Sequence, residues 1–315
     1  MKMRLAVLAA VALALPVAVA GAAVDVEVVV DYDLAAGEQP EGVAVDKRGD
    51  VFVSLTPLGR IEKVDRDGSR STLAQIVPPG TGGGTNGLAV DAPGIVYAAV
   101  ATSDPATSGV YKIARDGSFT RLAGTGAIAF PNGVTFDKRG NLYVSDTILG
   151  AVWRVPASGG LAELWFRSDL LAGDGSFGLG FPLGANGIAF RHKEIVVGNT
   201  EFGRLVKIEI EPDGSAGTVS ILAEGPALLG VDGIAFDVHG NVWAAVIVQS
   251  TIVSVSPNGA VTTVATAADG LDWASSIAFG KSHDLWAVNF AIGPPGGPGP
   301  ALLRLEVGVK GQPLP

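Results

Sequence analysis

The sequence contains no cysteine among its 315 residues and only three histidines. Without cysteine the chain can form no disulfide, carry no lipid-modified cysteine and offer no thiolate to zinc. Basic residues are also outnumbered, because 22 Lys and Arg stand against 31 Asp and Glu, for a formal net charge of −9. This balance argues against nucleic acid or an anionic membrane surface as a partner, and it fits a soluble protein or one that handles a cation.

A hydrophobic run occupies the N-terminus. Two basic residues precede the almost wholly apolar stretch 5–19, and small-x-small cleavage motifs follow at 18–20 and 20–22. This order is typical of a secretory signal peptide, and Pro16 with the small residues favours cleavage over an uncleaved anchor. We therefore expect residues 1–22 to be a signal peptide, the mature protein to have no stable membrane span, and its location to be secreted or periplasmic.

One sequence unit occurs six times in the rest of the chain. Its copies are EGVAVDKRGDVFVS from Glu41, NGLAVDAPGIVYAAV from Asn86, NGVTFDKRGNLYVSD from Asn132, NGIAFRHKEIVVGN from Asn186, DGIAFDVHGNVWAAV from Asp232 and SSIAFGKSHDLWAVN from Ser275. The copies recur about every 45 residues, apart from a longer interval between Asn132 and Asn186. A β-rich repeat of this period predicts a propeller or a related array.

Each unit encodes four strands. After the first two runs come two alternating runs around a DG, GG or NG turn, as in GVYKIARDGSFTRL, which is a strong hairpin signal. Six such units predict an all-β, six-bladed β-propeller that forms a single domain over residues 24–315. The strand-like segment Val24–Tyr32 has no unit of its own, and Ala301–Val307 is only a third strand, so we expect the N-terminal strand to complete the last blade. The regular period argues against two stacked sandwiches.

The first residue of each unit carries a side-chain oxygen. These six residues, here called the oxygen ring, are Glu41, Asn86, Asn132, Asn186, Asp232 and Ser275. Asn and Asp often merely cap turns, but six oxygen-bearing residues in register, two of them acidic, would converge at one mouth of the channel. Ca²⁺ prefers such a mixture of carboxylate and amide oxygens, whereas zinc prefers His or Cys. The ring therefore predicts a calcium site, with another divalent cation as the alternative.

The histidines do not accompany this ring. His192, His239 and His283 all fall in the turn after the first strand of their units, at the opposite end of that strand. The usual proton carrier is therefore absent from the metal mouth, and carboxylates and metal-bound water remain as the candidate chemistry.

The motifs PEG at 40–42, PNG at 131–133, ANG at 185–187 and VDG at 231–233 follow one another around the ring. In these motifs the sequence resembles the senescence marker protein/gluconolactonase/luciferin-regenerating enzyme family of calcium-dependent six-bladed propellers, to which diisopropyl fluorophosphatase is related. The resemblance implies that Glu41, Asn132, Asn186 and Asp232 hold the metal. It also implies that Asp232 is the general base or nucleophile in hydrolysis of a lactone or ester.

Two departures concern the substrate mouth. The sugar-acid lactonases of this family tend to have Arg and Asp where this chain has Phe130 and Gly133, which implies a less polar mouth. The long interval contains GDGSFGLGFPLG at 173–184, which we expect to overhang the metal mouth with Phe177 and Phe181 as apolar lining or, alternatively, to be a surface loop.

Further residues are candidates for supporting roles. Asn86 and Ser275 could add a metal ligand or a substrate contact. Asp146, Asn199 and Asn289 end the second strands of their units and could form a second shell around the metal, or simply serve strand-end turns.

Three functional classes remain open. The first is a secreted calcium-dependent hydrolase of a small-molecule lactone or ester, acting as a monomer. The second is a non-catalytic NHL-repeat-like binding propeller with a structural metal. The third is a strictosidine synthase-like or lyase-type propeller, although the lyases of this shape rely on His, which the mouth lacks. The Glu41/Asp232 pair favours the hydrolase, because a binding-only propeller has no need for two acids at one mouth.

Overall fold

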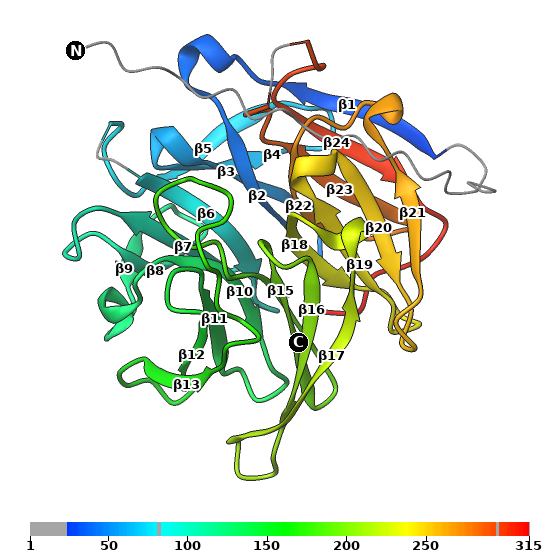
Figure 1. Cartoon of the computed structure of the whole chain (residues 1–315). Helices are drawn as coiled ribbons and strands as arrows, with labels where there is room; N and C mark the ends of the chain where they lie inside the picture. The colour runs from blue at the N-terminus through cyan, green and yellow to red at the C-terminus, as the bar shows by residue number, and fades with distance from the viewer. Residues whose placement is uncertain (1–23, 81–82, 294–295, 315) are drawn as a thin grey trace, which may run out of the picture.

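The computed structural model describes residues 24–80, 83–293 and 296–314. The predicted signal peptide lies outside these residues. Six four-stranded antiparallel sheets surround a common centre (Figure 1). Each innermost strand contacts the innermost strands of both neighbouring sheets, and the last contacts the first. The predicted six-bladed β-propeller is thereby confirmed.

The blades follow one another along the chain, each running from the innermost strand outward. Blade 1 comprises β2 (Pro40–Val45), β3 (Val51–Leu55), β4 (Arg60–Val64) and β5 (Arg70–Gln75). Blade 2 comprises β6 (Gly83–Val90), β7 (Val96–Thr102), β8 (Gly109–Ile113) and β9 (Phe119–Arg121). Blade 3 comprises β10 (Pro131–Phe136), β11 (Leu142–Asp146), β12 (Ala151–Val155) and β13 (Glu163–Arg167).

The second half of the chain repeats this order. Blade 4 comprises β14 (Ala185–Arg191), β15 (Glu194–Asn199), β16 (Arg204–Ile210) and β17 (Ala216–Glu224). Blade 5 comprises β18 (Val231–Phe236), β19 (Val242–Val246), β20 (Thr251–Val255) and β21 (Val261–Ala265). Blade 6 comprises β22 (Ala274–Phe279), β23 (Asp284–Asn289), β24 (Ala301–Glu306) and β1 (Asp25–Asp31).

Among the residues that the structure describes, the helical segments are short 3-10 turns in the loops. They are η1 (Leu34–Ala36), η2 (Thr56–Leu58), η3 (Thr125–Ala127), η4 (Pro226–Leu228), η5 (Ile247–Gln249) and η6 (Ala267–Asp269). Within the described part of the chain, no helix has both the length and the apolar character needed to cross a membrane.

The ring is closed by the N-terminal strand, as the sequence predicted. β1 pairs antiparallel with β24, so the first described strand completes the last blade. Beyond β1, the ring of Tyr32 lies under the Arg70 guanidinium of blade 1, with 4.9 Å between guanidinium carbon and ring centroid. Arg70 also forms a 2.7 Å ion pair with Glu38. These contacts fasten the closing strand to the first blade.

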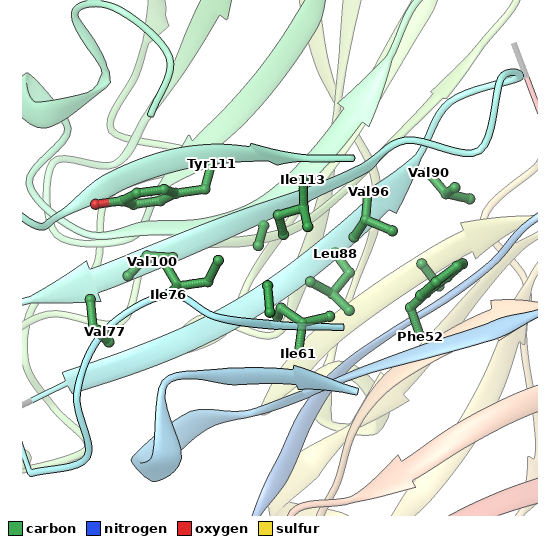
Figure 2. Packing of buried hydrophobic residues seen from close by; sticks show 13 residues of the cluster. Phe52, Ile61, Ile76, Val77, Leu88, Val90, Val96, Val100, Tyr111 and Ile113 are labelled. Carbon is green, nitrogen blue, oxygen red and sulfur yellow. The ribbon is translucent and has the colours of Figure 1, made fainter. Parts of the chain in front are cut away.

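The hydrophobic core lies between the blades. Among the described residues, six apolar clusters each combine side chains from two neighbouring blades. Figure 2 shows the cluster between blades 1 and 2, where Phe52 and Ile61 face Leu88 and Val96. Burial of each such side chain contributes roughly 1.5–3 kcal/mol, which explains the apolar composition of the strands.

Aspartate side chains build the turns between the first and second strands. In blade 3, Asp137 Oδ1 accepts hydrogen bonds from the backbone N–H groups of Arg139 and Asn141 at 2.8 and 2.9 Å. Gly140 supplies the left-handed residue of this turn with φ of 82°. The DKRG segment therefore serves a turn at the far end of the inner strand, away from the oxygen ring.

The C-terminal tail covers that far end of the channel. The backbone N–H of Gln312 donates to the Phe236 carbonyl, and its Nε2 donates to the Phe190 carbonyl, both at 2.9 Å. Residues 312–314, with all six inner strands, line a cavity of about 170 Å³, and Leu314 packs against the core between blades 1 and 2. The tail therefore lies across the end of the channel that is opposite the oxygen ring.

Candidate metal centre

Five residues of the predicted oxygen ring line one small cavity of about 50 Å³. They are Glu41, Asn132, Asn186, Asp232 and Ser275. The structure does not place Asn86 among the lining residues, although its neighbours Gly87 and Leu88 are there. Asn86 Nδ2 instead donates to the Pro131 carbonyl of the next blade at 3.1 Å, so it ties blade 2 to blade 3.

The ring residues do not precede the inner strands, as the sequence reading assumed, but lie inside them at a β-bulge. In blade 3, Pro131 pairs with Asp146, and regular pairing resumes only at Val134. Asn132 and Gly133 are therefore displaced from the ladder, and the other inner strands have equivalent register shifts. A bulge re-aims the side chain that it carries, here toward the channel.

The glycine after the ring residue is required by packing. A Cβ at Gly133 would lie 2.7 Å from the backbone oxygen of Asn186 in the next blade, a distance that real side chains do not tolerate. The glycines that follow the ring residues of blades 1, 2 and 4 meet the next ring residue's carbonyl in the same way. The recurrent NG and DG pairs thus allow neighbouring inner strands to approach closely at the ring.

Serine hydroxyls connect the ring residues of neighbouring blades. Ser145 Oγ accepts from the Gly133 N–H at 2.8 Å and donates to the carbonyl of Asn186. At the closure of the propeller, Ser275 Oγ donates to the Glu41 carbonyl at 2.8 Å. The same arrangement as in blade 3 recurs in blade 1 with Gly42, Ser54 and Asn86. Ser275 is therefore a link between blades 6 and 1 as well as a lining residue.

Two threonines orient the ring amides. Asn132 Nδ2 donates to Thr147 Oγ1 at 3.2 Å, and Asn186 Nδ2 donates to Thr200 Oγ1 at 3.1 Å. Each threonine hydroxyl in turn donates to a backbone carbonyl where the next inner strand begins. These contacts engage one N–H of each amide and fix the orientation of the two ring asparagines.

The pKa values of the two acids of the ring, Glu41 and Asp232, are both raised. Burial raises the pKa of Asp232 to about 7, although a hydrogen bond with Asn186 lowers it. Burial, and then the negative charge of Asp232, raise the pKa of Glu41 well above its usual range. Glu41 Oε2 is also buried without a hydrogen-bond partner. Two acids held this way are costly to ionise unless a cation joins them.

The donor set fits a hard cation. Glu41 and Asp232 supply two carboxylates, and Asn132 and Asn186 can add neutral oxygens, which is the mixture that Ca²⁺ prefers once water completes the shell. In the described part of the chain, no three His, Cys, Asp or Glu side chains are grouped so that they alone could hold a metal ion. A metal held here would therefore depend on amide ligands as well as on the acid pair, and the orphaned Glu41 oxygen is consistent with such a role.

The predicted second-shell residues hold the loops that lead into the inner strands. Asp146 accepts from the Phe130 N–H at 3.1 Å, ahead of Asn132. Asn199 Nδ2 donates to the Ala172 carbonyl at 2.9 Å. Asn289 holds the approach to blade 6 by accepting from the backbone of residue 272 and donating to that of residue 270. These contacts steady the approaches to the ring.

A glutamate that the sequence reading missed fastens the 173–184 segment. Glu201 is 4% exposed, and its Oε2 accepts from the N–H groups of Asp174 and Gly175 at 2.6 and 2.9 Å. The far end of the segment is held where the Gly184 N–H donates to the Thr147 carbonyl at 3.1 Å. In the sequence, Glu201 is marked only by its position just after Asn199, the last residue of the second strand of blade 4. The segment is therefore anchored to blade 4 through Glu201 and to blade 3 through Thr147.

Of the aromatic residues predicted for the mouth, Phe130 and Phe181 contact each other, but neither they nor Phe177 are among the residues that line the ring cavity. The rings of Phe130 and Phe181 stack with centroids 5.7 Å apart and an interplanar angle of 21°. Phe177 lies in the same segment, where its backbone N–H donates to Glu201 Oε1 at 3.4 Å.

Comparisons with known proteins agree with this architecture. A family model, the SMP-30/Gluconolactonase/LRE-like region, matches residues 183–287, and a beta-propeller repeat model matches residues 119–145. A gluconolactonase from Xanthomonas campestris is 19% identical, with a TM-score of 0.66, 93% of this chain and 90% of that chain being covered. No curated protein matches the chain by sequence.

Two further structures show how widely the fold is shared. Regucalcin from Agrobacterium tumefaciens, described as a calcium-binding protein, is 15% identical with a TM-score of 0.66, covering 88% of this chain and 93% of that chain. Virginiamycin B lyase from Staphylococcus aureus is 16% identical with a TM-score of 0.57, covering 80% and 78%. At these identities the structures show the fold alone, and it is the family model over residues 183–287 that confirms the resemblance of this chain to the SMP-30/gluconolactonase/LRE-like family, a propeller family that includes lactonases.

Proposed function

We propose that the protein is a calcium-dependent hydrolase of a lactone or ester, exported from the cytoplasm. The observation that carries this proposal is the pair of Glu41 and Asp232 in one cavity, where Asp232 is buried and one oxygen of the partly buried Glu41 is enclosed without a hydrogen-bond partner. No lysine or arginine lines this cavity to neutralise the two acids, so the pair does not serve as part of a structural ion pair there. Export is supported by the hydrophobic N-terminal run with its small-x-small motifs.

The ring residues would have two roles, cation binding and proton transfer. Glu41, Asn132, Asn186 and Asp232 would hold the cation, which when bound supplies a Lewis acid for the substrate carbonyl. Asp232 would accept a proton on its carboxylate from the water that attacks the carbonyl carbon. The bond from that carbon to the leaving oxygen then breaks, and the proton passes to that oxygen, giving an acid and an alcohol.

The test combines metal analysis with turnover. Purified protein is expected to contain calcium near one equivalent and to hydrolyse members of a panel of lactones and aryl esters, with activity lost on chelation and restored by calcium. Asp232→Asn should retain the fold and lose turnover. Asp213→Asn changes an exposed aspartate in an outer turn and should behave as wild type.

Two outcomes would contradict the proposal. Turnover that persists in Asp232→Asn would remove that residue from the chemistry. Bound calcium without hydrolysis of any panel member would instead support a non-catalytic binding propeller with a structural metal.

A further inference from the structure

Two aromatic residues occupy corresponding positions on opposite sides of the oxygen ring. The positions two residues ahead of the ring residues are Gln39, Gly84, Phe130, Gly184, Gly230 and Trp273. Only the residues of blades 3 and 6 are aromatic, and in a ring of six blades these two are diametrically opposed. Three of the others are glycine, so the approach to the ring has two aromatic sides and little side-chain bulk between them.

The aromatic side at blade 3 is pre-organised. Phe130 stacks on Phe181, and each ring comes from a loop that leads directly into a ring amide. Buried carboxylates hold both loops: Asp146 accepts from the Phe130 N–H, and Glu201 accepts from the start of the 173–184 segment. The pair is therefore held in place before any ligand arrives, which reduces the entropy lost on binding.

The aromatic side at blade 6 is held in a strained backbone conformation. Trp273 has φ of 50°, which is unfavourable for a bulky side chain. Its N–H donates to Ser250 Oγ at 3.0 Å and its carbonyl accepts from the Phe290 N–H at 3.1 Å. Ser250 and Ala291 also have positive φ, of 49° and 54°. Strain maintained by surrounding contacts is concentrated at functional sites in proteins, and here it lies two residues from the ring.

Several loops around this mouth carry exposed apolar side chains. The exposed large side chains on them include Ile148, Leu179, Phe202, Leu229 and Ile292. No lysine or arginine is among the residues that line the ring cavity. A polyhydroxylated sugar lactone would need hydrogen-bond donors and acceptors here, whereas an apolar group would gain from leaving water.

We propose that the substrate carries an apolar alkyl or aryl group next to its ester or lactone, and that Phe130, Phe181 and Trp273 hold this group. The proposal rests on the proposed hydrolase function of the same site. It identifies Phe130 and Phe181 as specificity residues, which contact the part of the substrate that does not react.

The turnover test uses p-nitrophenyl esters from acetate to octanoate, γ-lactones with alkyl chains of increasing length, and glucono-δ-lactone. We expect kcat/KM to rise by up to about fourfold for each methylene that becomes buried, and the sugar lactone to be the poorest substrate. Phe130→Ala and Phe181→Ala should flatten this dependence, with a loss of kcat/KM that grows with the length of the acyl chain. Phe130→Leu should retain most of the dependence, and Phe119→Ala, on outer strand β9, is the matched control.

A binding test separates this inference from the hydrolase proposal. Alkyl lactams, which resist hydrolysis, are titrated while tryptophan fluorescence is followed, and their affinity should increase with chain length in wild type but not in Phe130→Ala/Phe181→Ala. Affinity of this kind without any turnover would support the apolar subsite and sink the hydrolase function. The inference would be overturned by turnover that does not depend on chain length, or by a preference for glucono-δ-lactone. It would also be overturned if lactam affinity did not change with chain length while the exposed apolar loops bound lipid vesicles or a second copy of the chain.

Discussion

The buried acid pair predicts that calcium stabilises the protein more at high pH than at low pH. In the metal-free protein the pKa of Asp232 lies at about 7 instead of 3.8, and that of Glu41 is also raised. A carboxyl whose pKa is raised on folding favours the folded state while it is protonated. This contribution is fully present below the unfolded pKa and is lost as pH rises through the folded pKa. Stability of the metal-free protein should therefore fall between about pH 4 and pH 8 from this source.

The size of the effect follows from the shift. A change from 3.8 to about 7 corresponds to about 4 kcal/mol for Asp232. Calcium binds the ionised pair, so it should offset this loss where the acids are ionised and have little effect where they are protonated. For a domain of this size, 4 kcal/mol corresponds to roughly 10 °C in Tm.

The assay is thermal unfolding of dialysed, metal-free protein at pH 5, 7 and 8.5, with and without added calcium. The difference in Tm between the two states should be small at pH 5 and largest at pH 8.5. Taking this difference at each pH cancels the titration of carboxyls outside the ring, such as Asp237, whose pKa is lowered on folding.

Variants assign the effect to the ring. In Asp232→Asn the change in Tm on adding calcium should be small at every pH, and Glu41→Gln should behave similarly. Asp213→Asn is the control for loss of one negative charge. A calcium effect equal at pH 5 and 8.5, or one that survives in both ring variants, would refute the assignment of the cation to this pair.

Three further predictions concern the scaffold around the ring. Gly133→Ala should destabilise the protein by at least about 1–3 kcal/mol in urea unfolding, because its Cβ would lie 2.7 Å from the Asn186 carbonyl; wild-type stability would show that the strands can separate freely. Glu201→Gln should speed hydrogen exchange of the Asp174 and Gly175 amides, which bond to its carboxylate, while exchange in the blades stays unchanged; equal rates in both proteins would contradict the role given to Glu201. Leu314→Asp should lower stability by about 1 kcal/mol or more, because it places a charge against apolar inner strands; a Tm equal to that of wild type would show that the tail does not hold the channel end.

Much of the fold was predictable because it depends on a repeated local pattern. The recurrence of GVAV-like and GNLYVS-like runs fixes the number of blades, and the unmatched strand-like segments at the two ends predict closure by β1 against β24. The repeat also predicted that Glu41 and Asp232 lie together, because equivalent positions in the six blades converge on one axis.

The missed features depend on contacts between distant segments. Nothing near Asn86 shows that its amide bonds to Pro131 of the next blade and turns away from the cavity. Glu201 has no local mark apart from its place after a strand, because its partners lie in the 173–184 segment. The bulge at Asn132 escaped notice because an NG pair is also what a simple turn before a strand would contain.

The contacts that close the propeller are also the contacts that shape the metal site. Ser145 bonds to the backbone carbonyl of Asn186, and Ser275 bonds to that of Glu41, so the serines that join neighbouring blades position ring residues at the same time. Thr147 likewise receives the amide of Asn132 while bonding to the next strand. A cation that draws the ring oxygens together therefore acts on groups that already bridge the blades. Metal binding and closure of the propeller should consequently reinforce each other, which explains why two acids can be kept in the middle of the fold at a substantial cost in the metal-free state.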